Sequence, residues 1–227
     1  MSRRLALVWA VILLAAGVSF AGDVAQFVNL GFSKDGKYFM FGQYGVGQKD
    51  SAAWADTFIV DVKANAYAPK GTGQFAGTQP VDPGANGLGA LLNALADGLP
   101  RTKQLHIDHL STGRLLYVLL DGAEAADNLE FRDFQTGRSY KVVLTQNTAT
   151  DAGAAFGIGV TVTDKDGTSH SFTAGNPSYV RKGVRAYHIK QIILAPDGVS
   201  LVFVVQREEK DTQGSNVRYM VETTRDH

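Results

Sequence analysis

The chain is divided into many short segments rich in β-branched and aromatic residues, with Gly, Asp, Asn and Pro standing between them. Such segments favour β-strands, and the residues between them favour tight turns. The pattern therefore predicts a mainly β fold built from antiparallel hairpins. We expect strands at residues 24–32, 37–43, 56–62, 114–120, 129–134, 139–144, 156–163, 168–173, 185–194, 200–206 and 216–223.

Two segments interrupt the strand pattern. Leucines at helical spacing predict one main amphipathic helix at about residues 87–99, with its leucines packed on a sheet. Asn86 is placed to cap its start, and Gly98 and Pro100 to end it. The preceding residues, 68–87, are rich in Gly, Pro, Thr and Gln without periodicity, so we expect a flexible loop there. The leucines are Leu88, Leu91, Leu92, Leu95 and Leu99.

Two distant segments share one pattern around an Asp-Gly step. Residues 32–41 align with residues 194–203, and in both an apolar strand ending in Phe follows the step. The aspartate is expected to cap its own turn, and the glycine to accept a left-handed backbone. We therefore expect Gly36 and Gly198 to occupy equivalent hairpin turns. A second aligned pair consists of residues 57–65 and 129–137.

Four further stretches carry a likeness to known proteins: FVNLGFSKDGKY (27–38), IDHL (107–110), GNPSYVRKGV (175–184) and VRYMVET (217–223). With them, the mature chain resembles an uncharacterised family of predicted secreted bacterial proteins. The Asp-Gly pattern also resembles the WD40-like repeat of periplasmic propellers, such as the propeller domain of the Tol translocation protein. Neither resemblance implies an activity or particular site residues.

The length limits how far the propeller likeness extends. Propeller blades repeat about every 40–45 residues, whereas Gly36, Gly113 and Gly198 lie much farther apart than that. A regular propeller therefore does not fit the chain. Two antiparallel sheets built from repeated hairpin units fit better, arranged as a sandwich, a distorted barrel or a partial propeller-like structure.

The N-terminus has the features of a secretory signal peptide. A pair of arginines precedes an unbroken apolar run from Leu5 to Val18, which is shorter than the roughly 20 residues of a membrane-spanning helix. Small residues before a cut after Ala21 suit signal peptidase, so we expect residues 1–21 to be removed. The alternative is an uncleaved anchor. Residues 22–227 are then expected to form a single β-rich domain, exported to the periplasm or outside the cell.

Charge, hydropathy and cysteine content exclude several classes of function. The chain has 22 basic and 22 acidic residues, and removal of the signal leaves a formal charge of −2. No nucleic-acid partner is expected, because nucleic-acid-binding domains are usually strongly basic. No second long apolar run follows the signal, so we expect a soluble mature chain without a transmembrane segment. The absence of cysteine excludes disulfides, thiol chemistry and thiolate metal sites.

One short cluster has residue types that ligate metals, namely His106, Asp108 and His109. A zinc site needs three or four convergent ligands, and no partner motif accompanies these residues. We therefore expect Asp108 to satisfy nearby backbone amides, and neither a metal nor another cofactor to bind.

No nucleophile or phosphate-binding motif is present, but scattered acids leave one enzymatic alternative open. In that alternative the chain is a hydrolase of envelope carbohydrate or peptide, whose acids come together only in the fold. The candidate acids are Asp56, Asp61, Asp121, Glu124 and Asp133.

A group of basic and aromatic residues favours a binding function instead. Tyr179, Arg181, Lys182, Arg185 and Tyr187 crowd together in a chain whose net charge is close to zero. Arginines beside aromatic rings bind anions well. The alternative is that these residues are an ordinary loop and a charged edge strand, whose charges block aggregation. We predict that these five residues form one face for an anionic envelope ligand or an envelope protein. The chain is then a non-enzymatic binding or scaffolding module.

Overall fold

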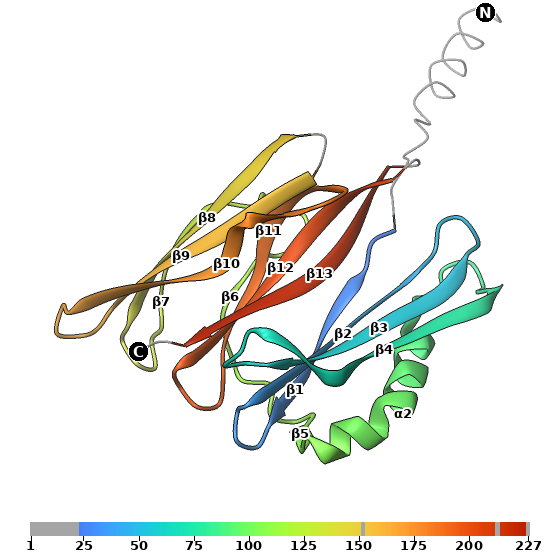
Figure 1. Cartoon of the computed structure of the whole chain (residues 1–227), viewed down its shortest axis with the longest axis horizontal. Coiled ribbons are helices and arrows are strands. Elements are labelled where there is room, and N and C mark those ends of the chain that lie inside the picture. Colours follow the sequence, from blue (N-terminus) through green and yellow to red (C-terminus); the bar gives the residue numbers. More distant parts are fainter. Residues whose placement is uncertain (1–22, 151–152, 212–213, 226–227) are drawn as a thin grey trace, which may run out of the picture.

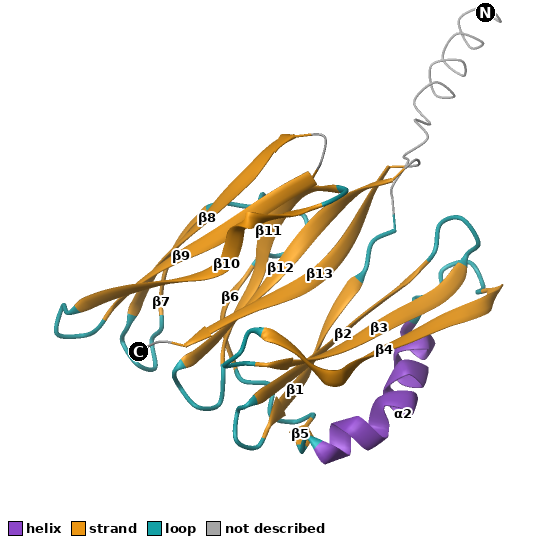
Figure 2. Cartoon of the chain, in the orientation of Figure 1, coloured by secondary structure: helices purple, strands orange, loops and turns teal. Residues whose placement is uncertain are grey.

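Three antiparallel sheets and one helix make up the part of the chain that the structure, a computed structural model, describes (Figures 1 and 2). The described residues are 23–150, 153–211 and 214–225. The expected signal peptide, residues 1–21, lies outside them. The mainly β fold class with one main helix is confirmed, although there are three sheets where we expected two.

Each sheet is named here by its position. The N-terminal sheet has the order β4-β3-β2-β1-β5, with β1 (Gln26–Ser33), β2 (Tyr38–Val46), β3 (Ala52–Asp61), β4 (Ala66–Pro80) and β5 (Ile107–Asp108). The middle sheet has the order β13-β12-β11-β6, with β6 (Arg114–Val118), β11 (Val184–Leu194), β12 (Ser200–Asp211) and β13 (Gly214–Arg225). The outer sheet has the order β10-β9-β8-β7, with β7 (Asn128–Arg132), β8 (Ser139–Thr150), β9 (Gly153–Thr163) and β10 (Ser169–Arg181).

The middle sheet is buried on both faces. Along β12, Leu201, Phe203 and Val205 pack in the core shared with the outer sheet. Val202 and Val204 alternate with them and pack in the core shared with the N-terminal sheet. All five side chains are at most 1% exposed. The sheets therefore stack in three layers (Figure 1), and the described strands close neither a barrel nor a propeller ring.

The turns expected to be equivalent have the same backbone conformation. Gly36 has φ 69° and Gly198 has φ 73°. The aspartate before each glycine accepts a hydrogen bond from the amide two residues further on. In the second aligned pair, Asn65 (φ 49°) and Gly137 (φ 76°) are also left-handed. The repeat alignment therefore predicted the turn geometry correctly.

The prediction of a flexible loop at residues 68–87 is largely wrong. Most of it belongs to β4, which is 15 residues long and pairs with β3 at the edge of the N-terminal sheet. Its register against β3 shifts twice, and Lys70 takes φ 54°. An edge strand tolerates proline, glycine and bulges because one row of its backbone groups needs no partner strand. The strand has no clear alternation for this reason, and the sequence pattern missed it.

The helix, α2 (Leu88–Gln104), is longer than expected. The N-cap is Gly87, with φ 67° and no side-chain cap, so the prediction that Asn86 caps the helix is wrong. Asn86, one residue earlier, still accepts a hydrogen bond from the Leu88 amide. Pro100 does not end the helix. Beyond it the buried Thr102 donates to the Gly98 carbonyl oxygen and contacts Met40 of the N-terminal sheet. This packing holds the last turn in place, although proline inside a helix costs about 3 kcal/mol.

Only part of the leucine stripe faces the sheet. Leu91 is 2% exposed and packs with Ala53 and Ala55 of β3, whereas Leu92 is 59% exposed. Leu88 and Leu99 are exposed as well. The expectation that the whole stripe is buried is therefore wrong.

Leu91→Ala and Leu92→Ala form a matched pair that tests this arrangement. We expect Leu91→Ala to lower the free energy of unfolding by about 2–5 kcal/mol, because it removes buried methyl groups and leaves a cavity. Leu92→Ala should change it by less than about 0.5 kcal/mol, as exposed substitutions usually do. Urea unfolding of the two variants measures the difference, and equal losses would contradict the orientation of the helix.

Candidate functional site

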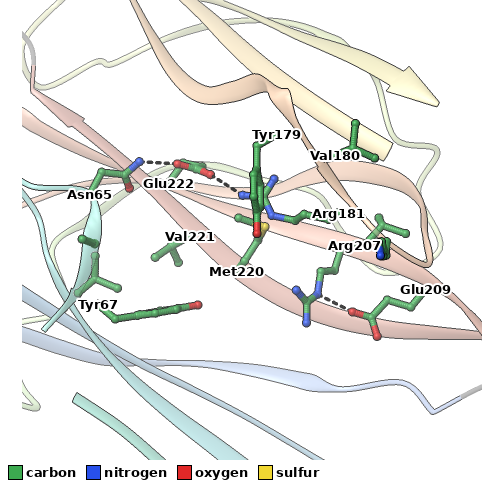
Figure 3. A pocket seen from close by; sticks show the side chains of 14 residues that line it. Asn65, Tyr67, Tyr179, Val180, Arg181, Arg207, Glu209, Met220, Val221 and Glu222 are labelled. Carbon is green, nitrogen blue, oxygen red and sulfur yellow. Dashed lines mark hydrogen bonds and ion pairs between the residues drawn. The ribbon is translucent and has the colours of Figure 1, made fainter. Parts of the chain in front are cut away.

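A cavity of about 650 Å³ lies where the edge strands of the three sheets meet. The N-terminal sheet contributes β4 and the turn before it, the outer sheet contributes β10, and the middle sheet contributes β12 and β13. Figure 3 shows Met220 and Val221 of β13 between the rings of Tyr67 and Tyr179, which come from the other two sheets. Three of the five predicted binding residues, Tyr179, Arg181 and Lys182, line this cavity.

Arg181 is the most constrained side chain of the cavity. Its guanidinium carbon lies 5.0 Å from the ring centre of Tyr179 and 5.3 Å from that of Phe156, which are cation–π distances. Nη2 forms an ion pair with Glu222 at 3.4 Å. Nη1 is buried and makes no hydrogen bond to any residue within the described ranges. The rings hold the guanidinium in place, and its Nη1 is buried without a hydrogen-bond partner among the described residues.

A chain of polar contacts through Glu222 connects the three sheets. The side chain of Glu222 in β13 is only 7% exposed and accepts a 2.5 Å hydrogen bond from Asn65 in the β3–β4 turn. Asn65 also accepts a hydrogen bond from the Thr223 amide at 2.8 Å. Together with the ion pair to Arg181, these contacts link the N-terminal, middle and outer sheets at the base of the cavity.

The cavity has a small excess of positive charge. Arg207 forms an ion pair with Glu209 at 2.7 Å, and Arg181 forms one with Glu222. Lys182 adds a third, exposed cation in the turn after β10. Partial burial also raises the pKa of the Tyr67 phenol, so this ring stays neutral at physiological pH. An anion entering the cavity therefore meets one unbalanced positive charge.

Tyr187 does not lie on the predicted binding face. Its side chain is fully buried, and its hydroxyl donates to the Ala154 carbonyl oxygen at 3.1 Å. Burial raises the pKa of this hydroxyl. The ring centre lies 6.0 Å from the guanidinium carbon of Arg181. Tyr187 therefore supports Arg181 from the core and cannot touch a ligand.

Arg185 also lies outside the cavity. It is exposed, and its Nη1 donates to the Ser215 hydroxyl at 3.2 Å. A regular strand would place Arg185 and Tyr187 on the same face, because side chains alternate along it. A bulge between Val184 and Ala186 breaks that alternation, because Val184 and Tyr187 are three residues apart yet pack in the same core. The bulge therefore separates Arg185 from the predicted group.

Four of the five acids considered for a hydrolase have structural partners. Asp56 accepts a hydrogen bond from Gln43, Asp61 accepts one from the Ala64 amide, and Asp121 pairs with Lys190. Asp133 pairs with Arg114, and the fifth acid, Glu124, is exposed.

Two other acids, Glu209 and Glu222, do line the cavity. Glu209 lies opposite Asn216, whereas Glu222 lies opposite Phe203. The backbones of the two glutamates are therefore about 20 Å apart along the strands, because each of the six residues between these positions adds about 3.3 Å. Glycosidase carboxylates are about 5–9.5 Å apart. The two cavity acids therefore do not form a glycosidase pair.

The residues considered for a metal site hold the loop after α2 in place. Nδ1 of His109 lies 2.6 Å from the Leu30 carbonyl oxygen, and Asp108 accepts a hydrogen bond from the Leu110 amide. His106 is exposed, with φ 53°. Across the described ranges, no group of three His, Cys, Asp or Glu side chains is arranged to hold a metal ion.

Sequence reasoning missed the other charged and aromatic residues of the cavity, which are Tyr67, Arg207, Glu209 and Glu222. They come from β4, β12 and β13, far along the chain from the basic and aromatic group. The one available signal was the charge run of residues 207–210, which is unusual directly after the apolar run of residues 201–205.

Comparison with known proteins gives a family but no annotated relative. Residues 40–225 match a family model described as "Predicted secreted protein (DUF2259)". No curated protein and no solved structure matches the chain. Within the described part of the chain, no helix is long and apolar enough to cross a membrane.

Proposed function

Because the chain belongs to the family of predicted secreted proteins known as DUF2259, we propose that it is a non-catalytic binding module of the bacterial envelope. Its cavity binds an anionic ligand, and the protein acts in the periplasm or outside the cell. The family description supports export. The binding role rests on the cavity.

The observation that carries the proposal is the state of Arg181. Three aromatic rings and Glu222 hold its guanidinium in place, while Nη1 has no hydrogen-bond partner among the described residues. A buried polar atom without a partner costs about 1–3 kcal/mol. A carboxylate or phosphate oxygen bound at Nη1 removes that cost, and the charge of Lys182 adds attraction.

Titration with two simple anions tests the proposal. Acetate and inorganic phosphate are added to the isotope-labelled mature protein, and backbone and arginine side-chain NMR signals are followed. We expect signals of Arg181 and Lys182 to move at millimolar anion concentrations. The effect should weaken as salt rises, since exposed charges are screened over about 8–10 Å at physiological ionic strength.

Three variants give this titration its controls. Arg181→Gln should weaken binding about tenfold or more, because a hydrogen bond to a charged group contributes about 1.5–3 kcal/mol. Lys182→Gln alters an exposed residue, so it tests the site even if Arg181→Gln does not fold. Arg185→Gln is the matched control and should bind like the wild type. Equal binding by all four proteins, or no movement of the Arg181 signals, would contradict the proposal.

A further inference from the structure

We propose that the anionic ligand of the cavity is an acidic saccharide, a short chain of sugar rings that carries carboxylate or phosphate groups. This inference rests on the proposed function and names the class of ligand. Three features carry it: two open tyrosine rings, an exposed pair of charged side chains, and an unpaired backbone position between the rings.

Tyr67 is the last ring in a row of stacked aromatic side chains. Ring centres lie 5.8, 4.8 and 5.4 Å apart along the row, with interplanar angles between 23° and 26°, in the order Phe27, Phe41, Phe58 and Tyr67. Phe58 therefore covers one face of the Tyr67 ring. Tyr67 is nevertheless 54% exposed and lines the cavity, so its other face is open to a ligand.

Tyr179 ends a second stack of flat groups. The guanidinium carbon of Arg181 lies 5.3 Å from the ring centre of Phe156 in the core and 5.0 Å from that of Tyr179. Arg181 therefore covers one face of Tyr179, yet Tyr179 is 58% exposed and lines the cavity. The N-terminal sheet and the outer sheet thus each bring one open aromatic face to the cavity (Figure 3).

Sugar rings suit open aromatic faces of this kind. The face of an aromatic ring carries partial negative charge, and the C–H groups on one face of a sugar ring carry partial positive charge. The edges of the same sugar are lined with hydroxyl groups, each of which can donate and accept hydrogen bonds. A site for saccharides therefore needs paired donors and acceptors beside its aromatic rings.

Arg207 and Glu209 are one such pair. Nε of Arg207 lies 2.7 Å from Oε1 of Glu209, and the two side chains are 31% and 29% exposed. A guanidinium has five N–H donors and a carboxylate about four acceptor sites, so this ion pair leaves groups free on both residues. One sugar hydroxyl can donate to Glu209 while its neighbour accepts from Arg207. A simple anion gains nothing from Glu209, because like charges repel.

The backbone of Val221 is the second pair. Residues of a paired strand point their N–H and C=O groups alternately toward and away from the partner strand. The Tyr219 amide points away from β12, because it donates to the Gln43 side chain at 2.8 Å. The Thr223 amide likewise donates to the Asn65 side chain. β13 pairs with β12 in continuous register, so the N–H and C=O of Val221 also point away from β12.

No described residue fills this backbone position. The outward N–H and C=O of Val221 have no hydrogen-bond partner within the described ranges, and Val221 lines the cavity. In extended backbone both groups point to the same side of the strand. Two adjacent hydroxyl groups of one sugar can therefore bind them together, one as acceptor and one as donor.

The cavity has room for more than one sugar ring. Its volume of about 650 Å³ lies within the range of about 300–1,000 Å³ found for small-ligand sites. Arg207 lies opposite Arg218, and Glu222 is four residues further along β13. The lining therefore extends over about 13 Å of strand, at about 3.3 Å per residue, which is longer than one pyranose ring.

Lys182 provides attraction for the acidic groups of the saccharide. It is exposed and is the third cation of a cavity whose other two, Arg181 and Arg207, form ion pairs with Glu222 and Glu209. A lysine ammonium binds carboxylate and phosphate alike, as a point charge on a flexible stem. Both acids therefore belong to the proposed class.

A matched set of trimers tests the inference. The labelled mature protein is titrated with trigalacturonate, with its neutral methyl ester, and with triglutamate, which carries acidic groups but no sugar rings. A phosphorylated maltotriose adds the phosphate form. We expect at least one of the two acidic saccharides to bind about tenfold or more tightly than the ester and triglutamate. The same ligand should move the Val221 amide signal and slow its hydrogen exchange.

Variants of the two tyrosines test the stacking. Tyr67→Ala and Tyr179→Ala should each weaken binding of that saccharide about fivefold or more, because each removes one aromatic face. Tyr67→Phe and Tyr179→Phe keep the rings and should bind within about twofold of the wild type. Phe134→Ala removes an 89% exposed ring outside the cavity, so it is the matched control and should bind like the wild type. Full affinity in both alanine variants would overturn the inference.

The outcomes separate this inference from the proposed function. If acetate and phosphate move the Lys182 signals but neither acidic saccharide binds more tightly than triglutamate, the saccharide inference is overturned and the anion site remains. If the neutral ester binds as tightly as trigalacturonate and the phosphorylated sugar, charge has no role, and the anionic ligand of the proposed function is overturned with it.

Discussion

Asp133→Asn should lower the free energy of unfolding by about 3 kcal/mol at neutral pH, because removing one partner of a buried ion pair leaves the other uncompensated. The Asp133 side chain is 1% exposed and forms two hydrogen bonds with Arg114 of β6. It also accepts hydrogen bonds from the Thr136 hydroxyl and the Gln135 amide. The pair connects the middle sheet to the turn after β7.

The effect of Asp133→Asn should depend on pH. Hydrogen bonding from Arg114 holds the pKa of Asp133 well below its usual value. A carboxyl whose pKa is lower in the folded protein contributes stability above its unfolded pKa of about 3.9, and loses it as pH falls toward the folded pKa. The advantage of the wild type should therefore begin to decline near pH 4 and shrink progressively as the pH falls further. Urea unfolding between pH 2.5 and pH 7 measures this.

Asp121→Asn is the matched control for this experiment. Asp121 also pairs with a cation, Lys190, at 2.6 Å, but its side chain is 96% exposed. Exposed ion pairs contribute about 0–1 kcal/mol. A loss with Asp133→Asn that stays constant down to pH 2.5, or a similar loss with Asp121→Asn, would contradict the role given to the buried pair.

Phe203→Ala should have a comparable effect, a loss of about 3–5 kcal/mol in the free energy of unfolding. Phe203 is fully buried in β12, in the core between the middle and outer sheets. Its removal opens a cavity in a sheet that is packed on both faces, where neighbouring strands have little room to move inward. Urea or thermal unfolding measures the loss.

The chain offers a control for the phenylalanine as well. Phe134 is 89% exposed, so Phe134→Ala should change stability by less than about 0.5 kcal/mol. Both substitutions remove the same atoms, and the difference between them reports burial alone. A loss of less than 1 kcal/mol with Phe203→Ala would mean that the two-sided packing of β12 is incorrect.

The strands could be predicted where burial and turn chemistry agree. The segment at residues 200–206 is apolar on both faces and follows an Asp-Gly turn, and it lies in β12 as expected. The strand β4 could not be predicted, because its pairing comes from β3 and its own sequence resembles a loop. Pro100 misled the prediction of the helix end for a similar reason, since tertiary packing outweighs a local signal.

The candidate site was predictable only in part. Tyr179, Arg181 and Lys182 are adjacent in sequence, so their grouping was visible. The bulge before Tyr187 was not visible, and it decides which residues face the core. The ion-pair partner of Arg181, Glu222, comes from a strand about 40 residues further on, where no local motif marks it. A site assembled from the edges of three sheets leaves only fragments of its pattern in the sequence.

The order of strands in the middle sheet has a consequence for how the chain folds. Its strand β6 lies beside β11, and the whole outer sheet is made by the residues between them. The start of the described chain is bonded to the last strand, where the Ala25 amide donates to the Val217 carbonyl oxygen at 3.1 Å. Contacts this distant in sequence place a β protein among slow folders, in the range of milliseconds to seconds. The layers therefore cannot close until β13, the last strand in the sequence, is available to pair with β12 and with the residues around Ala25.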